Sequence, residues 1–175
     1  MPSSNPSLIP TISKWIWTLN PNSILDVGCG FGRYGFLCRD ILDICKGRYK
    51  KSEWGVKIDG IEIFKYYITP MHEYLYDEII IGDIRKDEIG NYDLIILGDV
   101  IEHIEKEEGL RLVSRLLRKC KWMIIQTPHG FMKQGTVFGN PNEEHISSWY
   151  PEDFNEYYPQ IEINNNIFVV LLRGK

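Results

Sequence analysis

A glycine-rich turn preceded by an acid is the segment of this chain best suited to hold a ligand. Asp26 is followed by Gly28, Gly30 and Gly32. Glycines lack a Cβ and let a ligand press against the backbone, and such a turn before a helix often holds an anionic group. Asp26 would repel a dinucleotide's pyrophosphate and would attract a cation. Arg33 also replaces the last glycine of the dinucleotide fingerprint. The turn therefore predicts a ligand with an adenosine, a carboxylate, an ammonium and a sulfonium.

Three further acids are expected at the same edge of a sheet. Glu62, Asp83 and Asp99 each stand at the end of an apolar run that predicts a strand. Ligands of open α/β sheets bind outside the carboxyl ends of the strands. Together with Asp26, these acids favour a cationic ligand with hydroxyls and an exocyclic amine. Each acid alone could instead be a solvated turn residue or a helix cap. The spacing supports Glu62 least, because the basic, aromatic loop 46–54 lengthens the gap before it.

Alternating strand and helix patterns supply the elements that must position these residues. Apolar residues at helical spacing predict helices, continuous apolar runs predict buried strands, and three asparagines predict a turn within a terminal hairpin. This order predicts an α/β protein, a three-layer α-β-α sandwich around a doubly wound, mostly parallel sheet with an antiparallel edge hairpin. Helices are expected over 8–19, 34–45, 104–119 and 151–158, and strands over 24–27, 56–63, 79–81, 92–97, 122–126, 161–163 and 167–172.

With these residues in place, the sequence resembles the class I, Rossmann-like methyltransferases that depend on S-adenosylmethionine. The resemblance rests on an acid-x-Gly-x-Gly-x-Gly motif after a hydrophobic strand and covers nearly the whole chain. It is greatest to uncharacterised microbial members of the small-molecule branch. It implies one domain over residues 1–175, a seven-stranded sheet with an inserted antiparallel strand, and a lid-like N-terminal helix within residues 1–20.

The same resemblance implies S-adenosylmethionine as cofactor and S-adenosylhomocysteine as product. By this likeness Glu62 would bind both ribose hydroxyls, Asp83 would accept from the adenine amine, and Asp26 would lie near the methionine amine. The cofactor-binding residues expected in this way are Asp26, Gly28, Cys29, Gly30, Gly32, Tyr34, Glu62, Ile63, Asp83, Ile84, Gly98, Asp99, Val100 and His103.

Catalysis needs few groups, because a sulfonium is already an activated methyl donor. Alignment of the reacting atoms supplies much of the rate, and an oxygen nucleophile often needs a base such as histidine. His145 and His103 are the catalytic candidates, with His129 behind them, although each could be a hydrogen-bonded loop residue. His72 is expected far from the strand ends and receives no role. An apolar wall for the acceptor is expected from Phe131, Phe138, Trp149 and Tyr150.

Composition narrows the class of protein. The 175 residues suit one domain, and the net charge of −4 argues against a nucleic-acid partner. The sequence shows neither an apolar run of about 20 residues nor a signal peptide, so a cytoplasmic protein without a membrane span is expected. Four cysteines without a C-x-x-C spacing, and no acid and amide cluster like the magnesium site of catechol-type enzymes, predict no metal.

The favoured function is methyl transfer to a small molecule, with an oxygen nucleophile. Enzymes that methylate exocyclic amines typically carry Asn/Asp-Pro-Pro-Tyr after the fourth strand, where this chain has Gly98-Asp99-Val100-Ile101. A cofactor-binding subunit or sensor without catalysis and an aminopropyltransferase-like enzyme stay open as alternatives, and a dinucleotide-dependent oxidoreductase is less favoured. The sequence indicates neither the acceptor, nor the oligomeric state, nor a role for loop 46–54.

Overall fold

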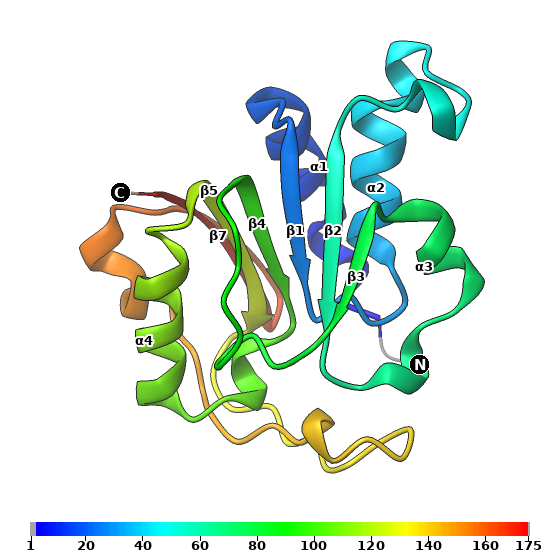
Figure 1. Ribbon diagram of the computed structural model, residues 1–175. Coiled ribbons are helices and arrows are strands. Elements are labelled where there is room, and N and C mark those ends of the chain that lie inside the picture. The colour runs from blue at the N-terminus through cyan, green and yellow to red at the C-terminus, as the bar shows by residue number, and fades with distance from the viewer. Residues whose placement is uncertain (1–2, 175) are drawn as a thin grey trace.

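Seven strands form one mixed sheet in a computed structural model that describes residues 3–174, so residues 1–2 and 175 of the expected domain lie outside it. The strand order is β3-β2-β1-β4-β5-β7-β6 (Figure 1). Neighbours from β3 to β5 pair in parallel, whereas β7 is antiparallel to both β5 and β6. The strands are β1 (Ser23–Val27), β2 (Lys57–Glu62), β3 (Glu78–Ile81), β4 (Tyr92–Gly98), β5 (Cys120–Pro128), β6 (Gln160–Asn164) and β7 (Ile167–Arg173). The predicted α/β fold and its antiparallel edge are confirmed.

Helices cover both faces of this sheet and complete the three layers (Figure 1). On one face lie α1 (Ile9–Leu19), α2 (Arg33–Leu42) and α3 (Pro70–Leu75), and on the other lie α4 (Lys106–Leu116) and the 3₁₀ helix η7 (Pro151–Tyr157). Apolar residues at helical spacing turn inward, such as Ile12 and Ile16 of α1 and Leu116 of α4. The other 3₁₀ helices are η1 (Pro6–Leu8), η2 (Ile44–Lys46), η3 (Lys51–Glu53), η4 (Lys65–Tyr67), η5 (Ile101–His103) and η6 (Pro141–Glu143). Within residues 3–174, no helix combines the length and apolarity that a bilayer crossing requires.

The strand order reverses beside β1, which lies between β2 and β4. Val27 of β1 is level with Ile61 of β2 and with Leu97 of β4. The residues that follow these positions are Gly28, Glu62 and Gly98, so the register brings three of the predicted ligand-binding positions to one edge of the sheet. A crevice at such a reversal is where open α/β sheets bind ligands.

Gly35 in the first turn of α2 offers a test of the packing beneath this edge. A Cβ at Gly35 would lie 2.3 Å from Cζ of Tyr76, a buried ring whose hydroxyl is bonded to Asp26. Glycine to alanine normally stabilises a helix interior by about 1 kcal/mol, but overpacking costs about 1–3 kcal/mol. We therefore expect Gly35→Ala to lower the free energy of unfolding, measured by urea denaturation. Gly90→Ala is the control, because nothing lies within 4 Å of its Cβ position; equal effects of the two substitutions would contradict the argument.

Candidate active site

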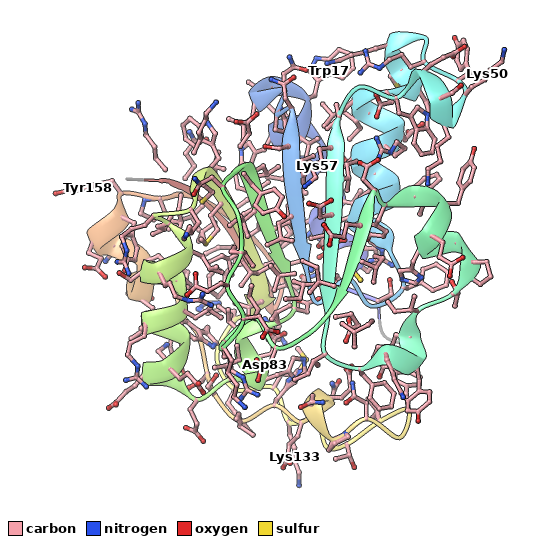
Figure 2. All side chains as sticks on the ribbon, viewed as in Figure 1. Trp17, Lys50, Lys57, Asp83, Lys133 and Tyr158 are labelled. Carbon is pink, nitrogen blue, oxygen red and sulfur yellow. The ribbon has the colours of Figure 1, made fainter. Side chains whose placement is uncertain are left out.

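A cavity of about 550 Å³ opens at the carboxyl edge of the sheet and has the size of a small-molecule site. Its walls come from the glycine turn, the ends of β2 and β4, the N-terminal residues 3–5 and the loop 129–150. Figure 2 shows Asp83 and Lys133 at this end of the molecule and Lys50 at the opposite end. Loop 46–54 contributes no residue to the cavity wall, so the structure gives it no part in this site.

The glycine turn presents bare backbone to the cavity. Gly28, Gly30 and Gly32 all have positive φ angles, of 65°, 49° and 87°. A Cβ at Gly28 would also lie 2.8 Å from Cγ2 of Val100, so any side chain there would be both strained and crowded. Gly28, Cys29 and Gly30 line the cavity, whereas Gly32 does not. That these residues bind a cofactor stays a prediction.

Asp26 lies beneath the turn and does not line the cavity. Its side chain is 1% exposed, and its Oδ2 accepts hydrogen bonds from the Tyr76 hydroxyl at 2.6 Å and the Gly35 amide at 3.2 Å. The carboxyl group therefore ties β1 to α2 and to the residue after α3. Its expected contact with a cofactor amine stays a prediction, since the structure places it one layer behind the cavity wall.

The buried carboxyl of Asp26 makes stability depend on pH. Burial raises its pKa from 3.8 to about 7, although the Tyr76 and Gly35 hydrogen bonds oppose the shift. Between about pH 4 and 7 the folded protein thus keeps a proton that the unfolded chain has released, so stability falls as the pH rises through this window. Asp26→Asn removes the effect. Its stability relative to wild type should increase from pH 4.5 to pH 8 by about 3 kcal/mol in urea denaturation. Parallel stability curves for the two proteins would contradict this.

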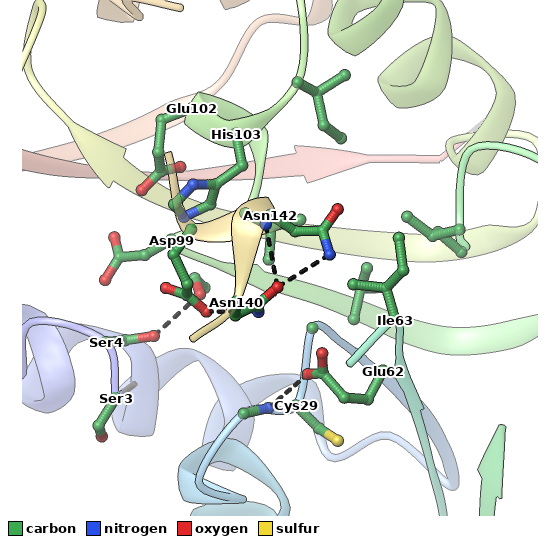
Figure 3. A pocket seen from close by; sticks show the side chains of 18 of the residues that line it. Ser3, Ser4, Cys29, Glu62, Ile63, Asp99, Glu102, His103, Asn140 and Asn142 are labelled. Atoms are coloured by element: carbon green, nitrogen blue, oxygen red, sulfur yellow. Dashed lines mark hydrogen bonds between the residues drawn. The ribbon is translucent and has the colours of Figure 1, made fainter. Parts of the chain in front are cut away.

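Glu62 joins the end of β2 to the glycine turn. Its Oε2 accepts from the Gly30 amide at 3.0 Å (Figure 3). Its Oε1 accepts from the Phe64 amide at 2.9 Å. Burial raises the pKa of this carboxyl, which is 4% exposed and lines the cavity. Each oxygen keeps the capacity to accept one more hydrogen bond. Glu62 can therefore bind two neighbouring hydroxyls of a ligand, as its predicted role requires.

His72 supports the same turn from behind, and the expectation that it lies far from the strand ends is wrong. It is fully buried, and its Nε2 lies 2.9 Å from the Gly30 carbonyl oxygen. Its Nδ1 accepts from the Thr69 amide at 3.1 Å, which leaves the proton on Nε2 to donate to Gly30. His72 thus fixes the position of the Gly30 carbonyl in the glycine turn.

Asp83 lines the cavity and is paired with Arg85, a residue to which the sequence-based prediction gave no role. The Arg85 guanidinium donates to both of its oxygens, at 2.8 and 2.7 Å, and holds the pKa of the carboxyl below its usual value. Arg85 also lines the cavity, as do the predicted Ile63 and Ile84. A ligand at this wall would therefore meet an ion pair beside apolar side chains rather than a lone carboxylate.

Residues 3–5 close the cavity over the end of β4. The Asn5 amide donates to Oδ2 of Asp99 at 2.9 Å, and the Ser4 hydroxyl donates to the Gly98 carbonyl at 3.0 Å. Asp99 has a left-handed backbone, with φ of 54°, and also accepts from Gln126. The predicted lid lay within residues 1–20; the residues that line the cavity are Ser3, Ser4 and Asn5, whereas α1 packs against α2. Four further residues of the predicted cofactor-binding set line the cavity, namely Tyr34, Gly98, Asp99 and Val100.

The loop 129–150 forms the remaining wall, and buried anchors hold it. The Tyr67 hydroxyl donates to Glu143 at 3.0 Å, and Asn140 donates to the same carboxylate at 3.2 Å. The expected aromatic wall is wrong for most of its members. Trp149 is fully buried in the core, and among the four only Phe138 lines the cavity.

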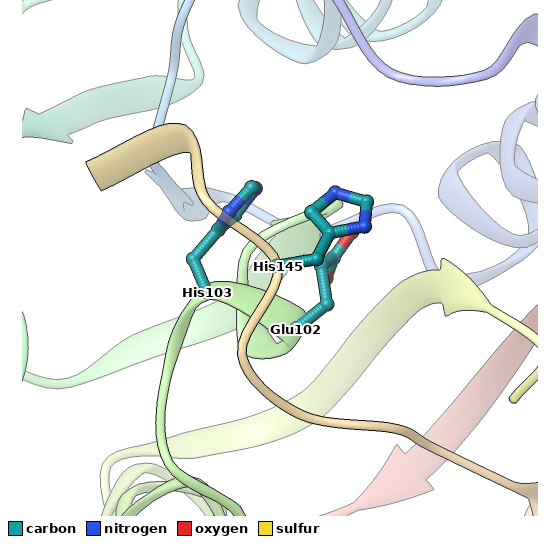
Figure 4. Close-up of side chains that lie close together, drawn as sticks. All are labelled: Glu102, His103 and His145. Atoms are coloured by element: carbon teal, nitrogen blue, oxygen red, sulfur yellow. The ribbon is translucent and has the colours of Figure 1, made fainter. Parts of the chain in front are cut away.

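Both catalytic candidates line the cavity beside a buried acid. The rings of His103 and His145 have their centroids 4.8 Å apart, next to Glu102 (Figure 4). Burial lowers the pKa of His103 to about 4, so its imidazole is neutral at pH 7. His129 does not line the cavity. The sequence-based prediction assigned no role to Glu102, although its position directly before His103 indicated that it could lie in the same site.

No protein-family model and no curated protein sequence matches the chain. Solved structures do match it. A SAM-dependent methyltransferase from Archaeoglobus fulgidus is 15% identical with a TM-score of 0.66, over 95% of this chain and 90% of that one. Magnesium protoporphyrin IX methyltransferase from Synechocystis PCC 6803, with bound SAM, is 15% identical with a TM-score of 0.61, over 95% and 78%. An rRNA methylase from Escherichia coli is 16% identical with a TM-score of 0.61, over 97% and 64%. The chain therefore has the fold of the class I, Rossmann-like methyltransferases.

Proposed function

We propose that this chain is a methyltransferase that uses S-adenosylmethionine to methylate an oxygen atom of a small molecule. The observation that carries the proposal is Glu62, whose carboxylate is bonded to Gly30 of the glycine turn and faces a cavity of about 550 Å³. An acceptor of two hydroxyls beside bare glycine backbone suits an adenosine ligand. The fold shared with the Synechocystis enzyme, which was crystallised with SAM, supports this choice.

Three groups of residues would each bind one part of the cofactor. Glu62 would accept from both ribose hydroxyls, and Ile63 and Ile84 would pack around the adenine near Asp83. Gly28 and Cys29, with Gly98, Asp99 and Val100 opposite, would surround the methionine part. Figure 3 shows Glu62 and Cys29 at one end of the cavity, His103 and Glu102 at the other, and Asp99 between them. This order would direct the methyl group toward the histidines.

The chemistry then requires one displacement and the loss of one proton. The acceptor oxygen forms a bond to the methyl carbon as the bond from carbon to sulfur breaks, and the sulfonium becomes the thioether of S-adenosylhomocysteine. Holding the three atoms in line supplies most of the acceleration. The acceptor proton leaves at the end of the cavity formed by His103 and His145, the two predicted catalytic residues.

A small acceptor is favoured over a nucleic acid by the walls of the cavity. Residues 3–5 and the loop 129–150 both border it, and the chain carries a net charge of −4. A nucleic-acid substrate usually needs an excess of basic residues for its phosphates. The E. coli rRNA methylase has the same fold, so the two acceptor classes need a direct test.

A cytoplasmic location stays a prediction. The four free cysteines agree with it, because the cytoplasm keeps thiols reduced.

Calorimetry with S-adenosylmethionine and S-adenosylhomocysteine tests the proposed cofactor. We expect one site for each, with a dissociation constant in the range of about 1–100 μM, and no binding of NAD⁺. Decarboxylated S-adenosylmethionine should bind more weakly than the intact cofactor, whereas an aminopropyltransferase would prefer it. Absence of binding of both ligands at about 1 mM would overturn the proposal.

The acceptor class is tested with cofactor carrying a labelled methyl group. The protein is incubated with a cell extract divided into small molecules, RNA and protein. We expect label in the small-molecule fraction, stable to mild base as an ether is. Label confined to RNA would contradict the small-molecule acceptor, and label in no fraction would favour a binding subunit or sensor.

A further inference from the structure

We propose that Glu102, His103 and His145 bind one divalent transition-metal ion at the acceptor end of the cavity. One ligand atom from each side chain lies within 4.8 Å of the other two (Figure 4). Two imidazoles and a carboxylate make up the protein ligands of many open catalytic metal sites. Bonds of about 2.0–2.2 Å would place the donors about 3.4 Å from one another, so the side chains would rotate toward the ion when it binds. The proposal revises the sequence-based expectation of no metal.

Each of the two histidines uses Nδ1 for a contact with a backbone carbonyl, which leaves Nε2 as the candidate metal ligand. Nδ1 of His103 lies 3.1 Å from the carbonyl oxygen of Glu144, and Nδ1 of His145 lies 2.6 Å from that of Met132. A carbonyl can only accept, so each Nδ1 carries the ring proton and each Nε2 offers a lone pair. Histidines that bind metals commonly donate their other ring N–H to a backbone carbonyl, which fixes the tautomer and the ring.

Glu102 supplies a second, independent observation. Its side chain is 2% exposed, Oε2 accepts from the Thr127 hydroxyl at 2.9 Å, and Oε1 is buried with no hydrogen-bond partner in residues 3–174. Oδ1 of Asp99, three residues earlier in the sequence, is also buried and has no hydrogen-bond partner among these residues. Neither acid forms an ion pair with a basic side chain of the described residues. Buried carboxylates are costly without a compensating charge, which a cation between these donors would supply.

The position of the ion gives it a function, if the proposed methyl transfer is correct. Three protein ligands leave coordination positions open toward the cavity, where an acceptor hydroxyl could bind. A metal-bound oxygen loses its proton near neutral pH, so the ion would both orient the nucleophile and activate it. The proton passes to water, the oxygen takes the methyl group, and His145 acts as a ligand rather than as the base. Acceptors with two adjacent oxygens, which can chelate the ion, would be preferred.

Titration of the chelator-treated full-length protein with Co²⁺ tests the site without cofactor or acceptor. We expect one equivalent of Co²⁺ to bind and to produce visible d–d absorption bands, and Zn²⁺ but not excess Mg²⁺ to remove them. His103→Ala and His145→Ala should each weaken binding by at least about 100-fold. His129→Ala is the matched control and should bind like wild type. Circular dichroism confirms folding of each variant, and the isosteric Glu102→Gln tests the carboxylate where an alanine variant fails to fold.

The outcome of the titration distinguishes a failure of the metal site from a failure of the proposed function. No Co²⁺ or Zn²⁺ binding at about 1 mM, or wild-type spectra and affinity in His145→Ala, would overturn the site. Binding of S-adenosylmethionine in that case would leave the proposed function standing. Conversely, tight Co²⁺ binding that requires all three side chains supports the site even if the cofactor fails to bind.

Discussion

Trp149→Ala should lower the free energy of unfolding by about 3–5 kcal/mol, the usual cost of deleting a large buried aromatic ring. The Trp149 side chain is fully buried and stacks on Phe154, with 5.7 Å between ring centroids. Its indole N–H donates to the Ile101 carbonyl at 3.1 Å and to the Ser147 hydroxyl at 2.9 Å. The Lys106 ammonium lies 3.9 Å from the ring centroid. Deletion of the indole ring would therefore create a cavity, leave the polar partners of its N–H unpaired and remove the cation–π contact with Lys106.

Urea denaturation followed by far-ultraviolet circular dichroism measures the effect. Trp17→Ala is the matched control, because Trp17 is 58% exposed and its replacement should change stability by less than about 0.5 kcal/mol. Trp149→Phe keeps a smaller aromatic ring, so its free energy of unfolding should lie between those of wild type and Trp149→Ala. A loss below about 1 kcal/mol for Trp149→Ala would show that the core beneath the loop 129–150 is not packed as described.

The same substitution should disturb the acceptor end more than the cofactor end. Trp149 lies four residues after His145, and between them the amides of Ile146 and Ser147 both donate to the Glu102 carbonyl. These contacts join η5 to the loop 129–150. We therefore expect Trp149→Ala to lose more Co²⁺ affinity than S-adenosylmethionine affinity, if both ligands bind as proposed. The structure therefore makes Trp149, which the sequence assigned to a substrate wall, the anchor of the loop 129–150.

Local patterns were sufficient to predict the fold. The apolar run of β4 and the helical spacing in α4 each reflect burial against a neighbouring layer, which a short stretch of sequence records. The ends of β1, β2 and β4 follow from the same patterns, so Gly28, Glu62 and Gly98 could be assigned to one edge in advance. The mostly parallel sheet, which the structure confirms, follows from the alternation of strands and helices, and its antiparallel edge follows from the terminal hairpin.

Partners from distant segments could not be predicted in this way. Asp26 is bonded to Tyr76, fifty positions away, and Asp99 to Asn5, 94 positions away. His72 was expected far from the strand ends, but its contact with Gly30 depends on how α3 packs against α2. The sequence predicted four carboxylates at one edge of the sheet, whereas the structure buries Asp26 behind the cavity wall and pairs Asp83 with Arg85. The acceptor end depends most on such contacts, because His145 reaches Glu102 only through the folding of the loop 129–150.

Glu62→Gln should weaken S-adenosylmethionine binding about 10- to 100-fold, or by about 1.4–2.8 kcal/mol. An amide has one accepting oxygen, so either the Gly30 or the Phe64 N–H would face an NH₂ group. An unpaired buried donor costs about 1–3 kcal/mol, and the ribose hydroxyls would lose a charged acceptor. Glu78→Gln, at an exposed site on β3, is the control and should bind like wild type. Calorimetry gives both affinities, and thermal unfolding without ligand separates damage to the turn from loss of contact. Unchanged affinity in a folded Glu62→Gln protein would show that the ribose binds elsewhere, because no other side chain at the end of β2 offers two acceptors beside the glycine turn.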